Sequence, residues 1–204
     1  MPARVPVGTP LVGRLVRLDP MVPGDAEGLF PIMSDPAAFG SGYPFETAHA
    51  DLARTREFVG DRMAPGAWPY AVRVDSPGRD EVGTVAGTSS FTEIDTRNEK
   101  LQLGWTFYGR RYWASGVNVE TKLLLLSHAF EDLGFGRVKL QADVRNERSR
   151  AAITRLGARF EGVTRRDVLR EDGTWRDTAV YSITVDEWQT CRVALEERLR
   201  AVLR

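Results

Sequence analysis

The fold of this 204-residue chain is decided by the stretch LGWTFYGRRYWASGVNVE, residues 103–120. Its first half belongs to a segment, residues 100–107, in which apolar residues alternate or run together. This pattern predicts a strand that ends at Phe107. Its second half leads into a helix that begins near Asn118 and stops at Gly134, a residue type that commonly follows a helix end. The helix is predicted by apolar residues at helical spacing, namely Val119, Leu123, Leu126, Phe130 and Leu133.

The loop between this strand and this helix has the properties of an anion site. A helix start exposes unpaired backbone N–H groups and the positive end of the helix dipole. Gly116 lets the backbone approach an anion closely, and Arg111 can add a charged side chain. A diphosphate fits this arrangement, and the alternative is that Ser115 and Asn118 only cap the helix. The loop has neither the Gly-Lys-Ser/Thr of a Walker motif nor the three glycines of a dinucleotide fingerprint.

The segment that follows predicts a second strand and helix of the same kind. Alternating apolar residues predict a strand over 138–144, and residues 146–156 predict a helix capped by Asn146 and ended by Gly157. The order strand, helix, strand, helix predicts a parallel pair with a right-handed crossover. Helix starts after adjacent parallel strands lie at the same edge of a sheet, so one elongated ligand can touch both.

The remaining segments complete a fold of class α/β (α+β), with a mixed central sheet of about seven strands. Upstream elements are strands at Leu15–Leu18, Tyr70–Val74 and Glu81–Phe91 and helices at Asp25–Met33, with Asp25 as N-cap, and at Ala48–Met63. Downstream elements are strands at Phe160–Leu169 and Trp175–Thr184 around the hairpin turn Glu171-Asp172-Gly173, and a helix capped by Asp186 that runs to about Leu203. The sheet is expected to be antiparallel except for one parallel pair.

We expect a single domain over residues 1–204, because no linker, repeat or low-complexity segment divides the chain. Residues 1–12 are expected to form a loose N-terminal extension, and residues 186–204 a C-terminal helix.

Composition excludes several functions. Lys plus Arg equals Asp plus Glu at 28 each, so there is no net positive charge to hold a nucleic acid or an anionic membrane. Cys191 is the only cysteine, which excludes an internal disulfide and a thiolate zinc cluster. No apolar stretch reaches the roughly 18 residues of a spanning helix, and the first ten residues do not have the pattern of a signal peptide. We expect a cytoplasmic protein with no nucleic-acid partner, no membrane partner and no metal.

Ordered motifs in the second half of the chain resemble one known family. They are Leu103-Gly104-Trp105-Thr106-Phe107, Trp113 to Glu120, Asn146-x-x-Ser149, Leu156-Gly157-Ala158, Glu161-Gly162, Gly173-x-x-Arg176-Asp177-Thr178 and Glu187-Trp188. In this order they resemble the core of the GNAT superfamily N-acetyltransferases, in the branch of the bacterial ribosomal-protein N-terminal (alanine/serine) acetyltransferases. The similarity runs from about residue 15 to about residue 188 and is strongest over 103–183.

The resemblance implies an acyltransferase that uses acetyl-coenzyme A as cosubstrate and no metal. In this family a splay between the fourth and fifth strands admits the pantetheine arm, which pairs with fourth-strand backbone, here at Thr106 and Phe107. Asn146 would cap the next helix and can also bond the arm. The pyrophosphate would lie against the backbone of the loop, with Arg111 beside it; the loop residues are Trp113, Ala114, Ser115, Gly116, Val117 and Asn118. The family pattern is Gln or Arg, two residues, Gly, one residue, then Gly or Ala, so Gly116 matches while Trp113 and Asn118 depart from it.

The resemblance also assigns a catalytic residue. Many GNAT enzymes place a Tyr as acid on the helix after the fifth strand, but the matching position here is Ile153. In the ribosomal-type branch a Ser three residues after the helix-starting Asn takes this place, and Ser149 matches it. We therefore expect Ser149 to protonate or hydrogen-bond the coenzyme A sulfur; a first-turn Ser that only bonds backbone is the alternative.

No general base is assigned from the sequence. Gln102 occupies the position where relatives often carry Glu, and an amide does not accept a proton at neutral pH. A water chain or an acid elsewhere would have to serve, although each acid is expected more often to pair with a neighbouring Arg; these acids are Asp143, Asp167 and Asp177. His128 is expected to be packed on its helix and His49 to lie at a helix start near the substrate loop, and neither is expected to be catalytic.

The acceptor is expected among residues 39–45 and the strand ends around Thr92 and Trp175, with Phe39 and Tyr43 as substrate-binding residues. The resembled branch acts on protein N-termini, and similar folds acetylate small-molecule amines. The alternatives are a non-catalytic domain that binds or senses acyl-coenzyme A, and a protein that binds another nucleotide at the helix start. A homodimer is also considered, because the C-terminal helix carries a series of apolar residues: Val193, Leu195, Leu199 and Val202.

Overall fold

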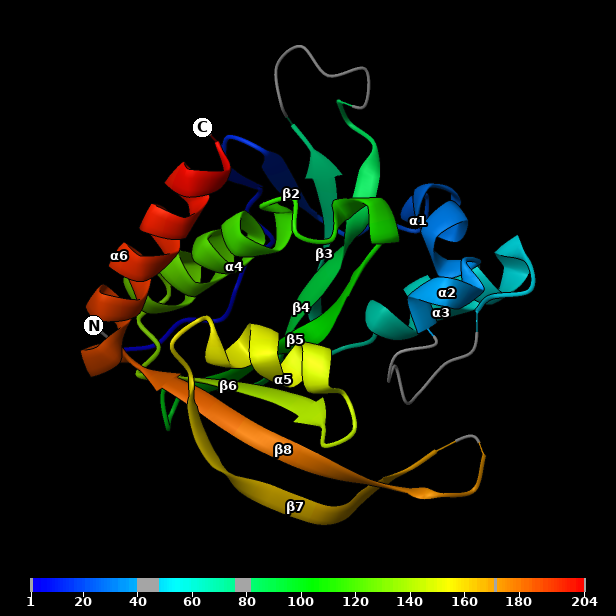
Figure 1. The fold of residues 1–204 in the computed structure, drawn as a ribbon. Coiled ribbons are helices and arrows are strands. Elements are labelled where there is room, and N and C mark those ends of the chain that lie inside the picture. Colours follow the sequence, from blue (N-terminus) through cyan, green and yellow to red (C-terminus); the bar gives the residue numbers. More distant parts are fainter. Residues whose placement is uncertain (1, 40–47, 76–81, 171, 204) are drawn as a thin grey trace.

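A computed structural model of the chain describes residues 2–39, 48–75, 82–170 and 172–203. These residues contain one eight-stranded sheet in the order β1-β2-β3-β4-β5-β6-β8-β7 (Figure 1). The strands are β1 (Leu11–Val12), β2 (Val16–Pro20), β3 (Trp68–Val74), β4 (Val85–Asp95), β5 (Lys100–Tyr108), β6 (Arg137–Asp143), β7 (Arg159–Leu169) and β8 (Trp175–Thr184). The predicted substrate-binding residue Tyr43, and the predicted strand and turn residues Glu81 and Glu171, lie outside the described residues.

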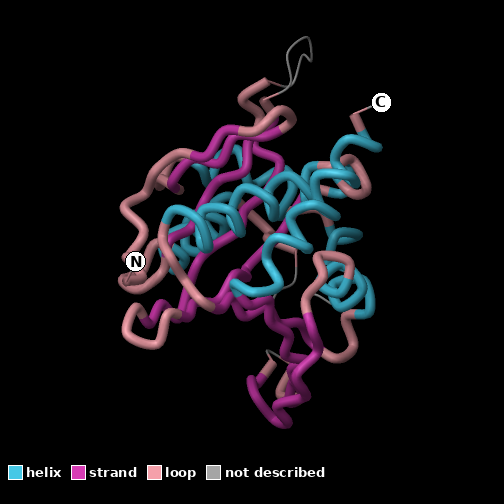
Figure 2. The backbone as a smooth tube through the Cα atoms, turned by 90° about the vertical axis from the view of Figure 1, so that its left-hand side faces the viewer, coloured by secondary structure: helices cyan, strands magenta, loops and turns pink. Residues whose placement is uncertain are grey.

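The predicted helices follow one another along the chain in the predicted order, with one short additional helix at Pro36–Phe39. They are α1 (Asp25–Met33), α2 (Pro36–Phe39), α3 (Leu52–Arg62), α4 (Val117–Ser127), α5 (Glu147–Thr154) and α6 (Val185–Val202), with a 3-10 turn at Arg110–Tyr112 and a π-helical turn at His128–Asp132 that continues α4. Figures 1 and 2 show α4, α5 and α6 on one side of the strands, while the β7–β8 hairpin reaches beyond them.

The sheet has one parallel contact, as predicted. Strands β5 and β6 are parallel and joined by the crossover that contains α4, and every other pair of neighbours is antiparallel. The eighth strand is the two-residue β1, which pairs with β2 and is too short to show an alternating pattern in the sequence. The fold class is therefore confirmed, with eight strands rather than about seven.

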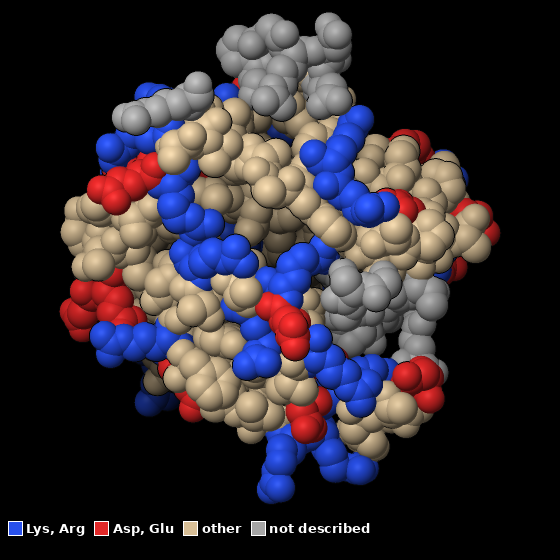
Figure 3. Space-filling model, in the orientation of Figure 1, with Lys and Arg blue, Asp and Glu red and all other residues tan. Residues whose placement is uncertain are grey.

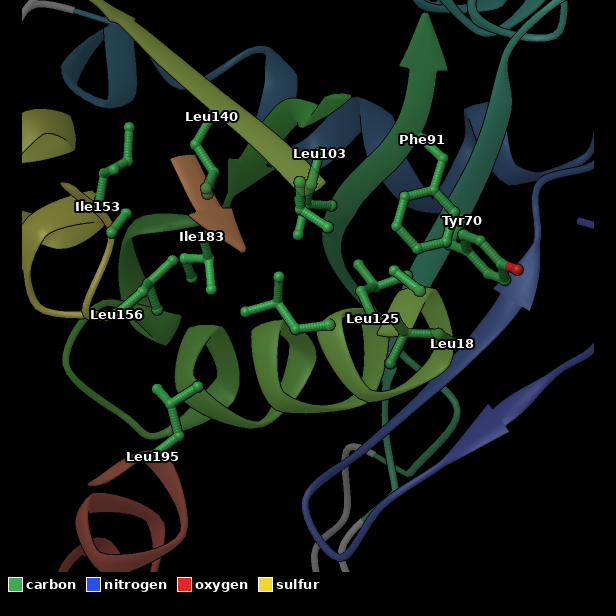
Figure 4. Packing of buried hydrophobic residues seen from close by; sticks show 14 of the residues in the cluster. Leu18, Tyr70, Phe91, Leu103, Leu125, Leu140, Ile153, Leu156, Ile183 and Leu195 are labelled. Atoms are coloured by element: carbon green, nitrogen blue, oxygen red, sulfur yellow. The ribbon is translucent and has the colours of Figure 1, made fainter. Parts of the chain in front are cut away.

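The main core lies between α4 and the sheet. Figure 4 shows Leu18, Tyr70, Phe91 and Leu103 of the strands pointing toward the helix that carries Leu125. A smaller apolar cluster joins α1 and α3 to β4 and β5, and its members include Leu29, Met33, Phe39, Phe58, Val85 and Phe107. Each Leu-sized side chain buried in these cores contributes roughly 1.5–3 kcal/mol to folding.

Two predicted helix caps are wrong. Gly24, not Asp25, is the N-cap of α1, because the buried carboxylate of Asp25 accepts from Val22 N at 2.8 Å and pairs with Arg73 of β3. Thr184, not Asp186, caps α6 and forms a reciprocal capping box with Glu187. Asp25 does not cap α1 because its carboxylate has other partners. Asp186 does not cap α6 because the Thr184 hydroxyl is better placed.

Element boundaries differ from the prediction at three further places. Helix α3 begins at Leu52, where Asp51 accepts from Arg54 N at 2.9 Å, so residues 48–50 precede the helix. Strand β4 begins only at Val85, with residues 82–84 outside the strand, and continues past Phe91 to Asp95. The four-residue α2 and the 3-10 turn are not predicted, since one turn of helix carries no periodic signal.

Both ends of the chain contact the core. Residues 2–10 have no regular structure, yet Ala3 is buried and Arg4 N–H donates to Leu133 O at 2.9 Å. On α6, Leu195 and Leu199 are buried within the chain, whereas Val193 and Val202 are exposed. The homodimer stays a prediction. Among the described residues, no helix combines the length and apolar character needed to cross a membrane.

Candidate active site

The site is built around a gap between the two central strands. Pairing between β5 and β6 covers only Lys100–Gln102 with Arg137–Lys139. Beyond this point β5 continues to Tyr108 and β6 to Asp143, so their neighbouring edges do not pair with each other. Strand edges that separate in this way present N–H and C=O groups that can bond an extended ligand. The splay predicted at the centre of the sheet is therefore present.

A bulge in β5 shapes one side of this gap. Trp105 has φ 53°, and the pairing with β4 shifts register between Thr88 and Ser90. The extra residue changes the side-chain alternation, because Leu103 lies in the main core while Phe107, four residues later, lies in the smaller one. Trp105 is 45% exposed, and its ring centroid lies 3.3 Å from the Arg62 guanidinium.

The loop at the open end of β5 leads into an uncapped helix. Gly116 is the N-cap of α4 with φ 88°, and no side chain caps the helix. Ser115 instead donates its hydroxyl to Tyr112 O at 2.6 Å, and Ala114 also has positive φ, at 57°. The alternative that Ser115 and Asn118 serve as caps therefore does not describe this helix. Without a side-chain cap, the N–H groups of the first turn remain suited to an anion.

The second helix start lies at the end of β6. Asn146 is buried and caps α5, accepting from Ser149 N at 2.9 Å, as predicted. Ser149 is half-buried, and within the described residues its hydroxyl has no hydrogen-bond partner. The alternative role, a hydroxyl bonded to backbone, is thus not seen in the described part of the chain.

Trp113 and Arg148 connect the two helix starts. The indole N–H of Trp113 donates to Tyr108 O at 3.1 Å, and the Arg148 guanidinium lies over the same ring at 3.6 Å. The loop before α4 and the first turn of α5 are therefore neighbours. Figure 3 shows Lys and Arg side chains gathered on this face around a hollow. Sequence reasoning missed Arg148, because no local pattern relates it to Trp113, which lies in a different segment of the chain.

The other predicted cofactor residues lie at the same end of the sheet. Arg111 is exposed and its guanidinium stands 4.8 Å from the Tyr112 ring. Thr106 and Phe107 lie in the part of β5 beyond its last pair with β6. The Thr106 hydroxyl contacts Ser89 Oγ at 2.8 Å and the Lys122 ammonium at 2.6 Å.

The predicted substrate residue Phe39 is packed inside the smaller cluster. Its ring stacks on Phe107 of β5 with centroids 4.9 Å apart and on His49 at 6.4 Å. His49 in turn bonds Thr55 Oγ1 at 2.9 Å. The end of α2 therefore contacts β5, while contact with an acceptor stays a prediction.

The acids considered as bases all have protein partners. Asp143 pairs with Arg170, and both side chains are almost fully buried. Asp167 accepts from the Thr178 hydroxyl at 2.6 Å, and Asp177 accepts from a main-chain N–H at 2.8 Å. Gln102 is buried, and its Oε1 has no partner in the described part of the chain. No grouping of metal-binding side chains occurs among the described residues.

Lys122, which contacts Thr106, is a second residue that sequence reasoning did not single out. It lies on α4 with 5% of its surface exposed, and burial lowers its pKa to about 7. The sequence does contain a signal for it: Lys122 is a charged residue directly before the apolar run Leu123 to Leu126, where a buried helix face is predicted. Lysine is almost never fully buried unless it is paired.

Comparison with known proteins identifies the family. The chain matches the description "Acetyltransferase (GNAT) domain" over residues 15–159. It is 33% identical to YdaF of Bacillus subtilis strain 168, provisionally named a ribosomal N-acetyltransferase, over 107 residues that cover 52% of this chain and 57% of YdaF. It is 26% identical over 168 residues to the N-acetyltransferase p20 of Bacillus licheniformis, which is uncharacterised, with 80% of this chain and 89% of p20 covered.

Solved structures agree with this match. A GCN5-related N-acetyltransferase from Brucella melitensis superposes with a TM-score of 0.88 at 27% identity, covering 97% of this chain and 88% of its own. A provisionally named acetyltransferase from T. thermophilus superposes with a TM-score of 0.84 at 32% identity, covering 96% of this chain and all of its own. The protein therefore belongs to the GNAT acetyltransferase family.

Proposed function

We propose that the protein transfers an acetyl group from acetyl-coenzyme A to a primary amine by direct attack in a ternary complex. The observation that carries this proposal is the gap between β5 and β6, which pair over three residues only and then separate between two helix starts. An extended thiol cofactor with a diphosphate at one end is complementary to an open strand edge that leads to an uncapped helix.

The cofactor would lie along β5 and end at the loop. Its pantetheine amides would pair with backbone at Thr106 and Phe107, and its pyrophosphate would accept from main-chain N–H groups between Trp113 and Asn118. Arg111 and the Arg148–Trp113 pair stand beside this loop and can supply charge to the phosphates. Asn146 holds the start of α5, where it can also reach the arm.

Ser149 would serve the leaving group. Attack of a neutral amine on the thioester carbon forms the C–N bond, and the C–S bond breaks to leave a thiolate that needs a proton or a hydrogen bond. The Ser149 hydroxyl is free of protein partners in the described region, because Asn146 bonds the main-chain N–H of Ser149 and not its side chain. Binding both reactants in line supplies much of the remaining rate enhancement.

The acceptor amine that we propose is a protein N-terminus. The support is the name of YdaF, which describes a ribosomal N-acetyltransferase, together with the motifs of the ribosomal-type branch. Small-molecule amines are the second acceptor class. Among the described residues, the acceptor would lie near the aromatic cluster of Phe39, His49 and Phe107.

An amine panel tests the proposed function. Purified protein is incubated with acetyl-coenzyme A and either peptides with free N-termini or small amines, and acetylated products are detected by mass spectrometry alongside release of the coenzyme A thiol. Acetylation of at least one amine is expected. Failure to bind acetyl-coenzyme A in calorimetry, with no product on any amine, would contradict the proposal.

The same experiment separates a second candidate function. A non-catalytic domain that binds acyl-coenzyme A is favoured by Gln102, a buried amide at a position where relatives often carry an acid, and by the apolar Ile153 in the core. Tight binding of acetyl-coenzyme A with no turnover on any amine would support this candidate.

A further inference from the structure

Lys122 lies at the centre of a small polar cluster beneath the bulge of β5. Its ammonium nitrogen is 3.0 Å from Ser89 Oγ of β4 and 2.6 Å from Thr106 Oγ1 of β5. The two hydroxyl oxygens are themselves 2.8 Å apart. The three groups therefore form a closed triangle of hydrogen bonds between α4 and two adjacent strands.

Among the described residues, this cluster contains no carboxylate that could neutralise a charged lysine. Both contacts that β4 and β5 make with Lys122 Nζ come from hydroxyl groups, and Tyr70 of β3, opposite Ser89, is a phenol whose pKa is raised by burial to about 12. On α4 itself, the Glu120 carboxylate accepts from three main-chain N–H groups of residues 14–16. Burial is therefore the cause of the lowered pKa of Lys122.

Such an arrangement is costly for a residue with a purely structural task. Burial of a lone ammonium removes it from water without a compensating charge, and an apolar side chain would fill the same space between α4 and the sheet without this cost. A buried amine whose pKa lies near neutrality is instead the type of group that exchanges a proton at physiological pH.

Thr106 connects this cluster to the gap between the strands. It follows the bulge residue Trp105, it is half-buried, and it lies in the part of β5 beyond the last pair with β6. Its hydroxyl can therefore face both the buried lysine and a group bound at the open strand edge.

We propose that Lys122 takes up the proton that the acceptor amine loses, through the hydroxyl of Thr106. This inference rests on the proposed acetyl transfer and supplies the base that the site otherwise lacks. As the nitrogen attacks the thioester carbon, its proton passes to Thr106 Oγ1, whose own proton passes to neutral Lys122 Nζ. The coenzyme A thiolate leaves and gains one proton from Ser149. Solvent then restores the proton of Ser149 and takes up the proton of Lys122 by way of Thr106, so the net change is one proton lost by nitrogen and one gained by sulfur. Lys122 acts through Thr106 and does not touch the substrate.

Kinetics of matched variants test this role. Lys122→Met keeps the length of the side chain without a basic group, and Thr106→Val keeps the shape of Thr106 without its hydroxyl. Each is expected to lower kcat about 100-fold, with the KM for acetyl-coenzyme A changed less than about twofold. The double variant is expected to be no slower than either single one. The control is Lys100→Met, at the exposed start of β5, the strand that carries Thr106. It is expected to keep wild-type kinetics.

The pH profile separates a proton acceptor from a structural lysine. In wild-type protein the plot of log kcat against pH is expected to be one unit steeper below about pH 7 than in Lys122→Met, because one more proton must be lost. An unchanged kcat in Lys122→Met, or an unchanged slope, would overturn the inference. If Lys122→Met does not fold, an unchanged kcat in Thr106→Val overturns it equally. Absence of turnover in the wild-type protein would count against the proposed function instead.

Discussion

At the residue scale, Ser149 illustrates how a helix cap leaves a side chain available for chemistry. The Asn146 side chain accepts from the main-chain N–H of Ser149, so the cap uses the backbone of Ser149 and leaves its hydroxyl without a described protein partner. The cap could be predicted from the sequence, because Asn at a helix start has a strong preference for this role. The availability of the hydroxyl could not, since it depends on which groups surround the helix.

Ser149→Ala is expected to lower kcat about 100-fold and to leave the Kd for acetyl-coenzyme A nearly unchanged. The reason is that the hydroxyl would act on the sulfur only as the C–S bond breaks. The measurement pairs steady-state kinetics with calorimetry, and Ser127→Ala at the end of α4 is the matched control. Turnover by Ser149→Ala equal to that of the control would contradict the assignment.

Lys122 also makes a prediction that does not depend on activity. The unfolded lysine binds its proton up to a pKa of about 10.5, whereas the folded lysine does so only up to about 7. Unfolding therefore takes up a proton between these pH values, and the stability of the wild-type protein rises with pH across that window. Removing the amine removes this dependence.

Lys122→Met is accordingly expected to be more stable than wild type at about pH 6, by at most about 5 kcal/mol, and to lose that advantage as the pH rises from about 7 to about 10.5. Urea unfolding at three pH values, one below, one within and one near the top of this window, measures the difference. Lys100→Met, with half of its side chain exposed, serves as the control and is expected to show no such trend. A difference in stability that is constant with pH would show that Lys122 does not have a lowered pKa.

At the element scale, the start of α4 depends on the conformation of Gly116. A left-handed φ of 88° is accessible to glycine, and an added Cβ would stand 2.9 Å from Leu15 Cδ1 and from Val202 Cγ1. This single residue therefore sets the direction of the loop, the packing of the C-terminal helix and the presentation of the first-turn N–H groups.

Gly116→Ala is expected to lower the free energy of unfolding by about 1–2 kcal/mol and to weaken acetyl-coenzyme A binding, since the helix start must shift. Gly24→Ala is the matched control, because Gly24 has φ −67° and nothing lies within 4 Å of an added Cβ. Thermal unfolding and calorimetry of both variants give the comparison. Equal stability and equal acetyl-coenzyme A affinity in the two variants would show that the conformation of Gly116 is not required for the site.

Glu120 anchors the β1–β2 turn to α4. Its buried carboxylate accepts from the main-chain N–H groups of Arg14 at 2.8 Å, Leu15 at 2.6 Å and Val16 at 2.8 Å. Glu120→Gln replaces one of the two accepting oxygens by an NH2 group, which leaves at least one of these donors without an acceptor, and is expected to cost about 1.5–3 kcal/mol of stability in urea unfolding. Glu57→Gln on the exposed side of α3 is expected to stay within about 0.5 kcal/mol of wild type. A loss in Glu120→Gln no larger than in Glu57→Gln would show that the turn is held by other contacts.

At the scale of the whole molecule, the parallel strand pair could be predicted because it follows from local patterns. Strand, helix, strand and helix over residues 100–156 require a parallel pair, and the structure has that pair between β5 and β6. Contacts between distant residues could not be predicted this way. The stacking of Arg148 on Trp113 and the contact of Lys122 with Ser89 join residues that no periodic pattern relates. The cap at Asp25 was mispredicted for the same reason, because its partner Arg73 lies 48 positions away.

A crystal structure of the protein with coenzyme A tests the central claim most directly. The account predicts the cofactor in the gap between β5 and β6, with its diphosphate bonded to main-chain N–H groups around Gly116 and its sulfur beside Ser149. Coenzyme A bound elsewhere, with the gap closed by the side chains of Trp113 and Arg148, would contradict it.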